Sequence, residues 1–132
     1  MQLVCPIPCE IGFIHGDLCG ENVVLEPGGQ LRLVDNEAIG VGAVDGDLAR
    51  TLYRWPMSSK TRAAFLGAYS EVRSLDTFFS GFPFWAMVAR LGSASHRIGA
   101  PRPVAAVPLE GLRRLIRNLE KGLSPSELVL ES

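Results

Sequence analysis

The sequence has no long uninterrupted apolar run, because Gly, Pro or a charged residue breaks each one well before the ~20 residues that a membrane-spanning helix needs. Its formal net charge of -1 gives no reason to expect nucleic acid or an anionic membrane as a partner. The first residues lack the basic start and the apolar core of a secretory signal peptide. The sequence therefore predicts a cytoplasmic protein.

Cysteine is scarce, and its three copies, Cys5, Cys9 and Cys19, lie close together. With His15 they give the spacing Cys-x₃-Cys-x₅-His-x₃-Cys, which contains four residues of the types that bind zinc. This spacing differs from the paired cysteines of common zinc sites. The sequence favours three reduced thiols, some buried as small hydrophobic groups, over a zinc site.

The chain has 132 residues, of which 47% are hydrophobic and 20% are charged. A chain of this length can bury roughly two-thirds of its surface, and this composition is typical of a globular protein. We expect a single domain, 1–132, with a catalytic segment at about 12–50 and a helical part at about 58–132.

The most informative stretch is a short apolar strand that leads into Asp17, followed five residues later by Asn22. A carboxylate fixed at the end of a strand is well placed to act as a general base. A β-hairpin is expected over 23–34, because two apolar arms flank a turn of Pro, two Gly and Gln, and it ends at Asp35. Asn22 and Asp35 carry the hard oxygen atoms that Mg²⁺ prefers. The spacing Asp-Leu-x₃-Asn is that of the catalytic loop in protein kinases.

Three segments in this order resemble the aminoglycoside phosphotransferase and choline kinase group of protein-kinase-like small-molecule kinases. They are His15-Gly16-Asp17-Leu18-x-x-x-Asn22, Leu33-Val34-Asp35-x-Glu37 and Gly46-Asp47-Leu48-Ala49. The resemblance implies that Asp17 is the catalytic base, and that Asn22 and Asp35 bind Mg²⁺ and, through it, ATP or another nucleoside triphosphate. It also implies that Asp47 hydrogen-bonds the catalytic loop, and that His15 supports the loop without taking part in the chemistry.

The sequence departs from this group in two ways. Asn36 stands where many relatives have an aromatic residue after the metal-binding Asp. In addition, residues 1–12 cannot hold the glycine-rich loop, the strand Lys and the helix Glu of a nucleotide-binding lobe. The chain thus resembles the C-terminal lobe alone, and the N-terminal lobe is absent. A second chain, or a second copy of this chain, is a candidate to cover the surface that the lobe would cover.

After Asp35, residues 36–46 are rich in glycine and lack helical periodicity. They do not form a phosphate-binding loop, because they follow the metal-binding Asp and lack a Gly-Lys-Ser/Thr ending. Two interpretations stay open: a flexible surface connection, or the counterpart of an activation segment near the acceptor pocket.

The remainder predicts helices. We expect a short helix over 47–55, a second from Ser58 or Ser59 to about Val72, a third over about 84–94 with Pro83 in its first turn, and an amphipathic helix from Pro108. Residues 104–107 receive no assignment, and a capping box at 124–127 indicates a last short helix. Each of two helices has a stripe expected to face the core: Ala64, Phe65, Ala68, Tyr69 and Val72; then Leu109, Leu112, Leu115, Ile116 and Leu119.

Two further groups have a structural and a functional interpretation. Trp85 and Met87 could line an acceptor pocket, but packing against the preceding helix is the simpler explanation. The basic residues near the C-terminus are more typical of a solvated helix face than of a phosphate site. They are Arg113, Arg114, Arg117 and Lys121.

Together these observations predict a mainly helical α+β protein in which a small β-hairpin carries the catalytic groups. The expected function is ATP-dependent phosphorylation of a hydroxyl group on a small molecule, with Asp17 as base and with Asn22 and Asp35 as magnesium ligands. The alternative is a catalytically inactive kinase-like lobe that serves as a binding module. The sequence gives no indication of which hydroxyl compound is the acceptor.

Overall fold

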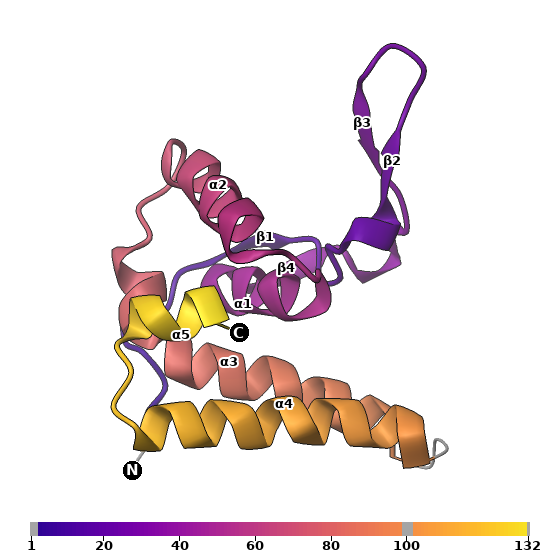
Figure 1. Ribbon diagram of the computed structural model, residues 1–132. Helices are drawn as coiled ribbons and strands as arrows, with labels where there is room; N and C mark the ends of the chain where they lie inside the picture. The colour runs from indigo at the N-terminus through magenta and orange to yellow at the C-terminus, as the bar shows by residue number, and fades with distance from the viewer. Residues whose placement is uncertain (1–2, 99–101, 132) are drawn as a thin grey trace.

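The computed structural model describes residues 3–98 and 102–131 and has a mainly helical α+β architecture (Figure 1). The helices are α1 Val44–Arg54, α2 Ser59–Ser70, α3 Asp76–His96, α4 Arg102–Glu120 and α5 Pro125–Glu131. The strands are β1 Ile11–Ile14, β2 Val23–Leu25, β3 Leu31–Leu33 and β4 Gly40–Ala43, and the short 3₁₀ turns are η1 Gly20–Asn22 and η2 Asn36–Ala38. Among the described helices, none is long and apolar enough to cross a membrane.

The strands form two separate antiparallel pairs. The first pairs β1 with β4, with Ile11 opposite Ala43 and Ile14 opposite Gly40. The second is the hairpin of β2 and β3, with Val23 opposite Leu33. This hairpin was predicted at the same place, and it projects away from the helices (Figure 1).

The core lies around α3, which contacts α1, α4 and α5. Phe78 and Phe82 of α3 are buried with their rings 5.4 Å apart in a T-shaped arrangement. Leu52 of α1, Leu115 of α4 and Val129 of α5 complete this core from the surrounding helices. The segment that holds the candidate catalytic residues is attached to the core through α1, which follows β4 without an intervening loop.

The interpretation of residues 36–46 as a flexible surface connection is wrong over most of the segment. Residues 40–43 form β4, and α1 begins at Val44 rather than at Asp47. Gly42 leaves room for a side chain of the paired strand, because a Cβ there would lie only 2.7 Å from Cδ1 of Ile14 on β1, and Ile14 would have to move its side-chain end to accept it.

The prediction that the third helix starts at Pro83 is also wrong. Residues 76–96 form one helix, with Pro83 in its interior and with buried residues on both sides of it. An interior proline usually costs about 3 kcal/mol, because it removes one hydrogen bond and clashes with the preceding turn. Burial of Phe78, Phe82 and Trp85 outweighs that cost.

Helix α4 begins at Arg102, and therefore includes residues 104–107 and has Pro108 in its interior. Between α3 and α4 the structure describes residues 97–98, and 99–101 lie outside the described residues. The predicted apolar face is correct at Leu112, Leu115 and Leu119, whereas Leu109 and Ile116 are exposed.

The start of α2 was predicted correctly, since the Ser58 hydroxyl caps the helix by accepting a hydrogen bond from the Thr61 N–H at 3.2 Å. Its predicted apolar face is wrong at Ala64, Ala68 and Val72, which are exposed. The buried face consists instead of Arg62 and Leu66 with Phe65 and Tyr69 beside them.

Arg62 is buried because it joins two helix ends. It donates to the Val129 carbonyl of α5 at 2.7 Å and to the Leu52 carbonyl of α1 at 3.2 Å. Both acceptors lie in the last turn of a helix, where carbonyls lack intrahelical partners and the helix dipole favours a cation. Burial and the nearby charge of Arg114 lower the pKa of Arg62.

The capping box of α5 was also predicted correctly. The Ser124 N–H donates to the Glu127 carboxylate at 2.8 Å, and the Glu127 N–H donates to the Ser124 hydroxyl oxygen at 3.4 Å. The last short helix therefore starts where the sequence indicated.

Candidate functional site

The candidate catalytic loop connects β1 to η1 and needs a glycine at its tightest point. Gly16 has φ of 79°, and a Cβ there would lie 2.6 Å from the Ala38 carbonyl oxygen. Both facts disfavour any other residue at this position. The loop thereby passes close to the turn that follows Asp35.

Asp47 attaches this loop to the first turn of α1. Its carboxylate accepts the His15 N–H at 3.1 Å and the Gly16 N–H at 3.0 Å, one on each oxygen. Hydrogen bonds to a charged acceptor are stronger than those between neutral groups. The residue just before Asp17 is therefore fixed to the helical part of the molecule.

Asn22 closes the other side of the loop. Its side-chain amide donates to the Asp17 carbonyl oxygen at 2.9 Å, and the residue is buried in η1. Because the amide nitrogen is used in this way, its carbonyl oxygen Oδ1 is left for another partner. The Asp17 backbone and the Asn22 side chain thus form one unit.

The hairpin returns the chain to Asn22. The Val34 N–H donates to the Asn22 carbonyl oxygen at 2.9 Å, and Asp35 is the next residue. Asp35 is exposed and adopts the left-handed conformation, with φ of 59° and ψ of 60°, which Asp tolerates better than most residues. The structure therefore brings Asn22 and the start of the Asp35 turn together.

The side chain of Asp17 is held by two arginines that the sequence reading did not single out. Arg50 Nη2 lies 3.1 Å and Arg54 Nη1 3.2 Å from Asp17 Oδ1. Among residues 3–98 and 102–131, the second carboxylate oxygen, Oδ2, has no hydrogen-bond partner. The available signal was the four-residue spacing of the two arginines, which places both on one face of α1.

The ring of His15 has no partner in the described parts of the chain, although both of its nitrogens are buried. His15 supports the loop through its backbone N–H, which binds Asp47, and not through its ring. The expectation of a bracing role therefore applies to the main chain of this residue.

The cysteines do not gather around His15. In the described residues, no three His, Cys, Asp or Glu side chains lie close enough together to hold a metal ion. Cys19 is buried, with its sulfur 3.9 Å from Arg54 Nη2, whereas Cys5 is exposed. The expected magnesium site is of a different kind, because it would use one amide oxygen, from Asn22, and one carboxylate, from Asp35.

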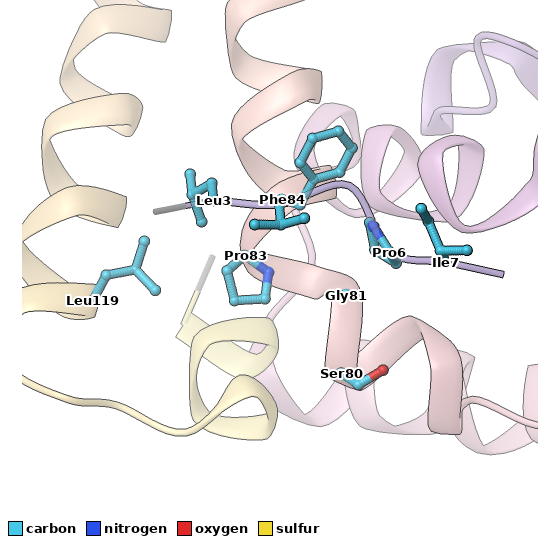
Figure 2. Close-up of a pocket in the computed structure, with 9 residues that line it drawn as sticks. Leu3, Pro6, Ile7, Ser80, Gly81, Pro83, Phe84 and Leu119 are labelled. Carbon is cyan, nitrogen blue, oxygen red and sulfur yellow. The ribbon is translucent and has the colours of Figure 1, made fainter. Parts of the chain in front are cut away.

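One hollow adjoins this loop, and another lies against the helices. One, of about 330 Å³, is lined by Arg54, Glu21, Tyr53 and Arg97, and adjoins Asp17 through Arg54. The other, of about 450 Å³, lies where the N-terminal segment crosses α3 (Figure 2). The described residues that line it carry no titratable side chain, so it offers packing surface and no acid or base.

Trp85 belongs to the core and not to either hollow. Its ring packs against Phe84 at 4.9 Å and against Gly46 of α1, where a Cβ would lie 3.1 Å from it. Trp85 therefore packs in the core, but the neighbours given above are Phe84 and Gly46 of α1 rather than the preceding helix, and Met87 packs against the same core.

Comparisons of the chain with protein-family models, with curated proteins and with solved structures find no match in any of the three. The candidate site therefore depends on its own residues and geometry.

Proposed function

We propose that this chain is the C-terminal lobe of a protein-kinase-like phosphotransferase that transfers a phosphoryl group from a magnesium-bound nucleoside triphosphate to a hydroxyl group of a small molecule. The observation that carries the proposal is the meeting of two segments at Asn22. Its side chain binds the Asp17 backbone at 2.9 Å, and its own carbonyl binds the residue before Asp35, also at 2.9 Å. The segment that carries Asp17 and the segment that carries Asp35 are thus joined through Asn22, which supports a shared site.

The residues have different roles in this proposal. Asp17 orients the acceptor hydroxyl and accepts its proton through Oδ2, the oxygen that the arginines leave open. Arg50 and Arg54 place two positive charges beside the position of transfer, where they would stabilise phosphoryl oxygens. Asp47 positions the loop through the His15 and Gly16 N–H groups and does not touch the substrate.

The oxygen donors fit magnesium. Asn22 offers Oδ1 because its Nδ2 is already bound, and Asp35 offers an exposed carboxylate without a hydrogen-bond partner among the described residues. Mg²⁺ usually takes one or two protein oxygens and fills its other positions with water and phosphate. When bound, the ion would neutralise charge on the nucleotide phosphates.

The proposal can be tested by calorimetry with a non-hydrolysable ATP analogue, with and without Mg²⁺. We expect a binding heat that requires the metal and that disappears in Asp35→Ala. Glu71→Ala is the matched control, because Glu71 is an exposed carboxylate at the end of α2. Equal heats in the two variants would contradict a role for Asp35 in binding.

The role of Asp17 needs a second measurement. With hydroxyl compounds as acceptors, Asp17→Ala should reduce nucleotide-dependent phosphorylation by about 10²–10⁴-fold, the usual contribution of a general base. It should leave the circular dichroism spectrum and the Asp35-dependent binding heat unchanged. Turnover equal to that of the natural chain would show that Asp17 is not the base.

A second candidate function is a binding module without catalytic activity. It is favoured by the exposed apolar side chains of the β1–β4 pair, where Phe13 and Val41 lie opposite each other and both face solvent. A second copy of the chain that covers this surface would give a dimer in light scattering, and the double change of Phe13 and Val41 to Ser would then give a monomer. A natural chain that stays monomeric at high concentration would argue against self-association.

A further inference from the structure

Arg73, in the connection between α2 and α3, is a largely buried cation that binds two carboxylates. Its Nε and Nη2 donate to Glu10 Oε2 at 3.1 and 2.8 Å, and its Nη1 donates to Asp45 Oδ1 at 2.9 Å. The side chain of Arg73 is 17% exposed and that of Asp45 is 6% exposed. Charge-assisted hydrogen bonds are strong, and the planar guanidinium fixes the direction of each. These bonds therefore hold Glu10 in a fixed position relative to Asp45.

The folded protein favours the charged form of Arg73. Burial alone lowers the pKa of Arg73, but hydrogen bonds to Glu10, Tyr69 and Asp45 raise the pKa above its ordinary value. Arg73 also supplies the positive charge that the buried Asp45 carboxylate needs, because an unpaired buried carboxylate is strongly destabilising.

Glu10 and Asp45 lie at one end of the β1–β4 pair. Glu10 directly precedes Ile11, whose partner in the other strand is Ala43, and Asp45 is the second residue of α1 after that strand. The Glu10 carbonyl also accepts the Val44 N–H at 3.1 Å. Main-chain and side-chain contacts thus join the two strands at the same end.

The candidate catalytic loop begins at the opposite end of the same pair. There Ile14 lies opposite Gly40, and the loop with Asp17 follows. β1 has four residues, so about 13 Å of extended chain separates its two ends. An extended strand cannot lengthen, so a shift at its start is transmitted to the loop at its end.

Helix α1 holds both ends of β1 through its first turn. Asp47 binds the loop N–H groups directly, at 3.1 and 3.0 Å, and Asp45 holds the start of the strand through Arg73. Both β1 and β4 contact α1 (Figure 1). One face of β1 adds little apolar burial, because Ile11 and Phe13 are 61% and 88% exposed. A two-stranded pair is only marginally stable, so the polar contacts at its ends fix its position.

We propose that Arg73 is a positioning residue for the candidate catalytic loop. By joining Glu10 to Asp45, it fixes the start of β1 against α1 and thereby sets the place of the loop at the other end of the strand. It acts through β1 and not through contact with substrate or metal. The effect on the loop stands on these contacts alone, whereas an effect on catalysis rests on the proposed phosphotransfer function.

Glu10→Ala tests the link between Glu10 and Arg73 without leaving a buried charge unpaired. The Glu10 side chain is 62% exposed, and Arg73 keeps Asp45 as its partner in this variant. Glu110→Ala is the matched control, because Glu110 is a 65% exposed glutamate that also pairs with arginines, but within α4.

Native-state hydrogen exchange measures the position of the loop independently of activity. In Glu10→Ala we expect the His15 and Gly16 amides to exchange about fivefold faster or more, while the Leu52 amide in the core stays within about twofold of its rate. Glu110→Ala should change none of these rates. Unchanged loop amides in Glu10→Ala, or equally faster exchange at all three amides, would overturn the proposal.

Arg73→Lys separates this link from a general loss of charge. A lysine keeps a positive charge for Asp45, but its ammonium lacks the planar set of donors that holds both carboxylates. We expect it to speed exchange of the loop amides about as much as Glu10→Ala. The double variant should add little to either change, because both cut the same link. Effects that multiply in the double variant would show two separate routes and contradict the proposal.

Kinetics then test the role in catalysis. With a hydroxyl acceptor and magnesium-bound ATP, Glu10→Ala should lower kcat about tenfold and leave the KM for the nucleotide within about twofold, because the proposed magnesium ligands do not lie on β1. A raised KM with an unchanged kcat would contradict a role in placing Asp17. No turnover by the natural chain would count against the proposed phosphotransfer, and the exchange rates would still decide the role of Arg73.

Discussion

The helical part and the β part of this protein bury their apolar side chains to very different extents. In the helices Phe82 is 1% exposed, and Leu52 and Val129 are equally well buried. In the β part Phe13 is 88% exposed, and the apolar residues of the β2–β3 hairpin mostly face solvent. Isolated two-stranded pairs of this kind are at best marginally stable in water. The free energy of folding therefore comes mainly from the helices.

The candidate site lies in the β part, so its geometry depends on the few contacts that tie it to α1. They include the hydrogen bonds of Asp47 to the loop and the ion pairs of Arg50 and Arg54 with Asp17. A scaffold of this kind permits changes at the site without loss of the fold. It also means that the same site can be disordered by one substitution in α1.

The largest contrast is expected between two Phe→Ala substitutions. Phe82→Ala removes a ring packed against Phe78 in the core and should lower the free energy of unfolding by about 3–5 kcal/mol. Phe13→Ala removes an exposed ring and should change it by less than about 0.5 kcal/mol. Urea unfolding followed by circular dichroism measures both. Similar losses from the two variants would mean that β1 contributes as much as the core.

A smaller effect is expected at the attachment between the two parts. Asp47→Asn replaces one carboxylate oxygen by an NH₂ group that cannot accept the His15 or Gly16 N–H, at a cost of about 1–3 kcal/mol. Hydrogen exchange should show faster exchange of these two amides, whereas the Leu52 amide in α1 keeps more of its protection. Asp76→Asn, on the exposed start of α3, is the control. If all three amides lost protection equally, the loop and the helices would be one cooperative unit.

The sequence predicted the parts of the structure that local signals determine. The β2–β3 hairpin follows from its Gly-Gly turn, the start of α2 from Ser58, and α5 from its capping box. The closeness of Asn22 to the start of the Asp35 turn follows from that hairpin.

The features that the sequence did not predict depend on contacts between distant segments. Strand β4 has two glycines and no strand-like alternation, and it forms because β1 pairs with it. Helix α3 continues through Pro83 because core packing on both sides outweighs a local penalty. The arginines that hold Asp17 lie 33 and 37 residues further on, and only the folded chain brings them there.

The smallest expected effect lies at the edge of the helical part, in the capping box of α5. Hydrogen bonds from the Ser124 hydroxyl and N–H lower the pKa of Glu127 from its ordinary value of 4.5. A carboxyl whose pKa is lower in the folded state stabilises the fold above its unfolded pKa, and this contribution is lost as the pH falls through the folded pKa. Glu127→Ala should therefore be slightly less stable than the natural chain at pH 7, and the difference should shrink as the pH falls below about 4.5. Thermal unfolding of both proteins across this range measures it, and a difference that stays constant with pH would assign the effect to helix propensity instead of the ionised cap.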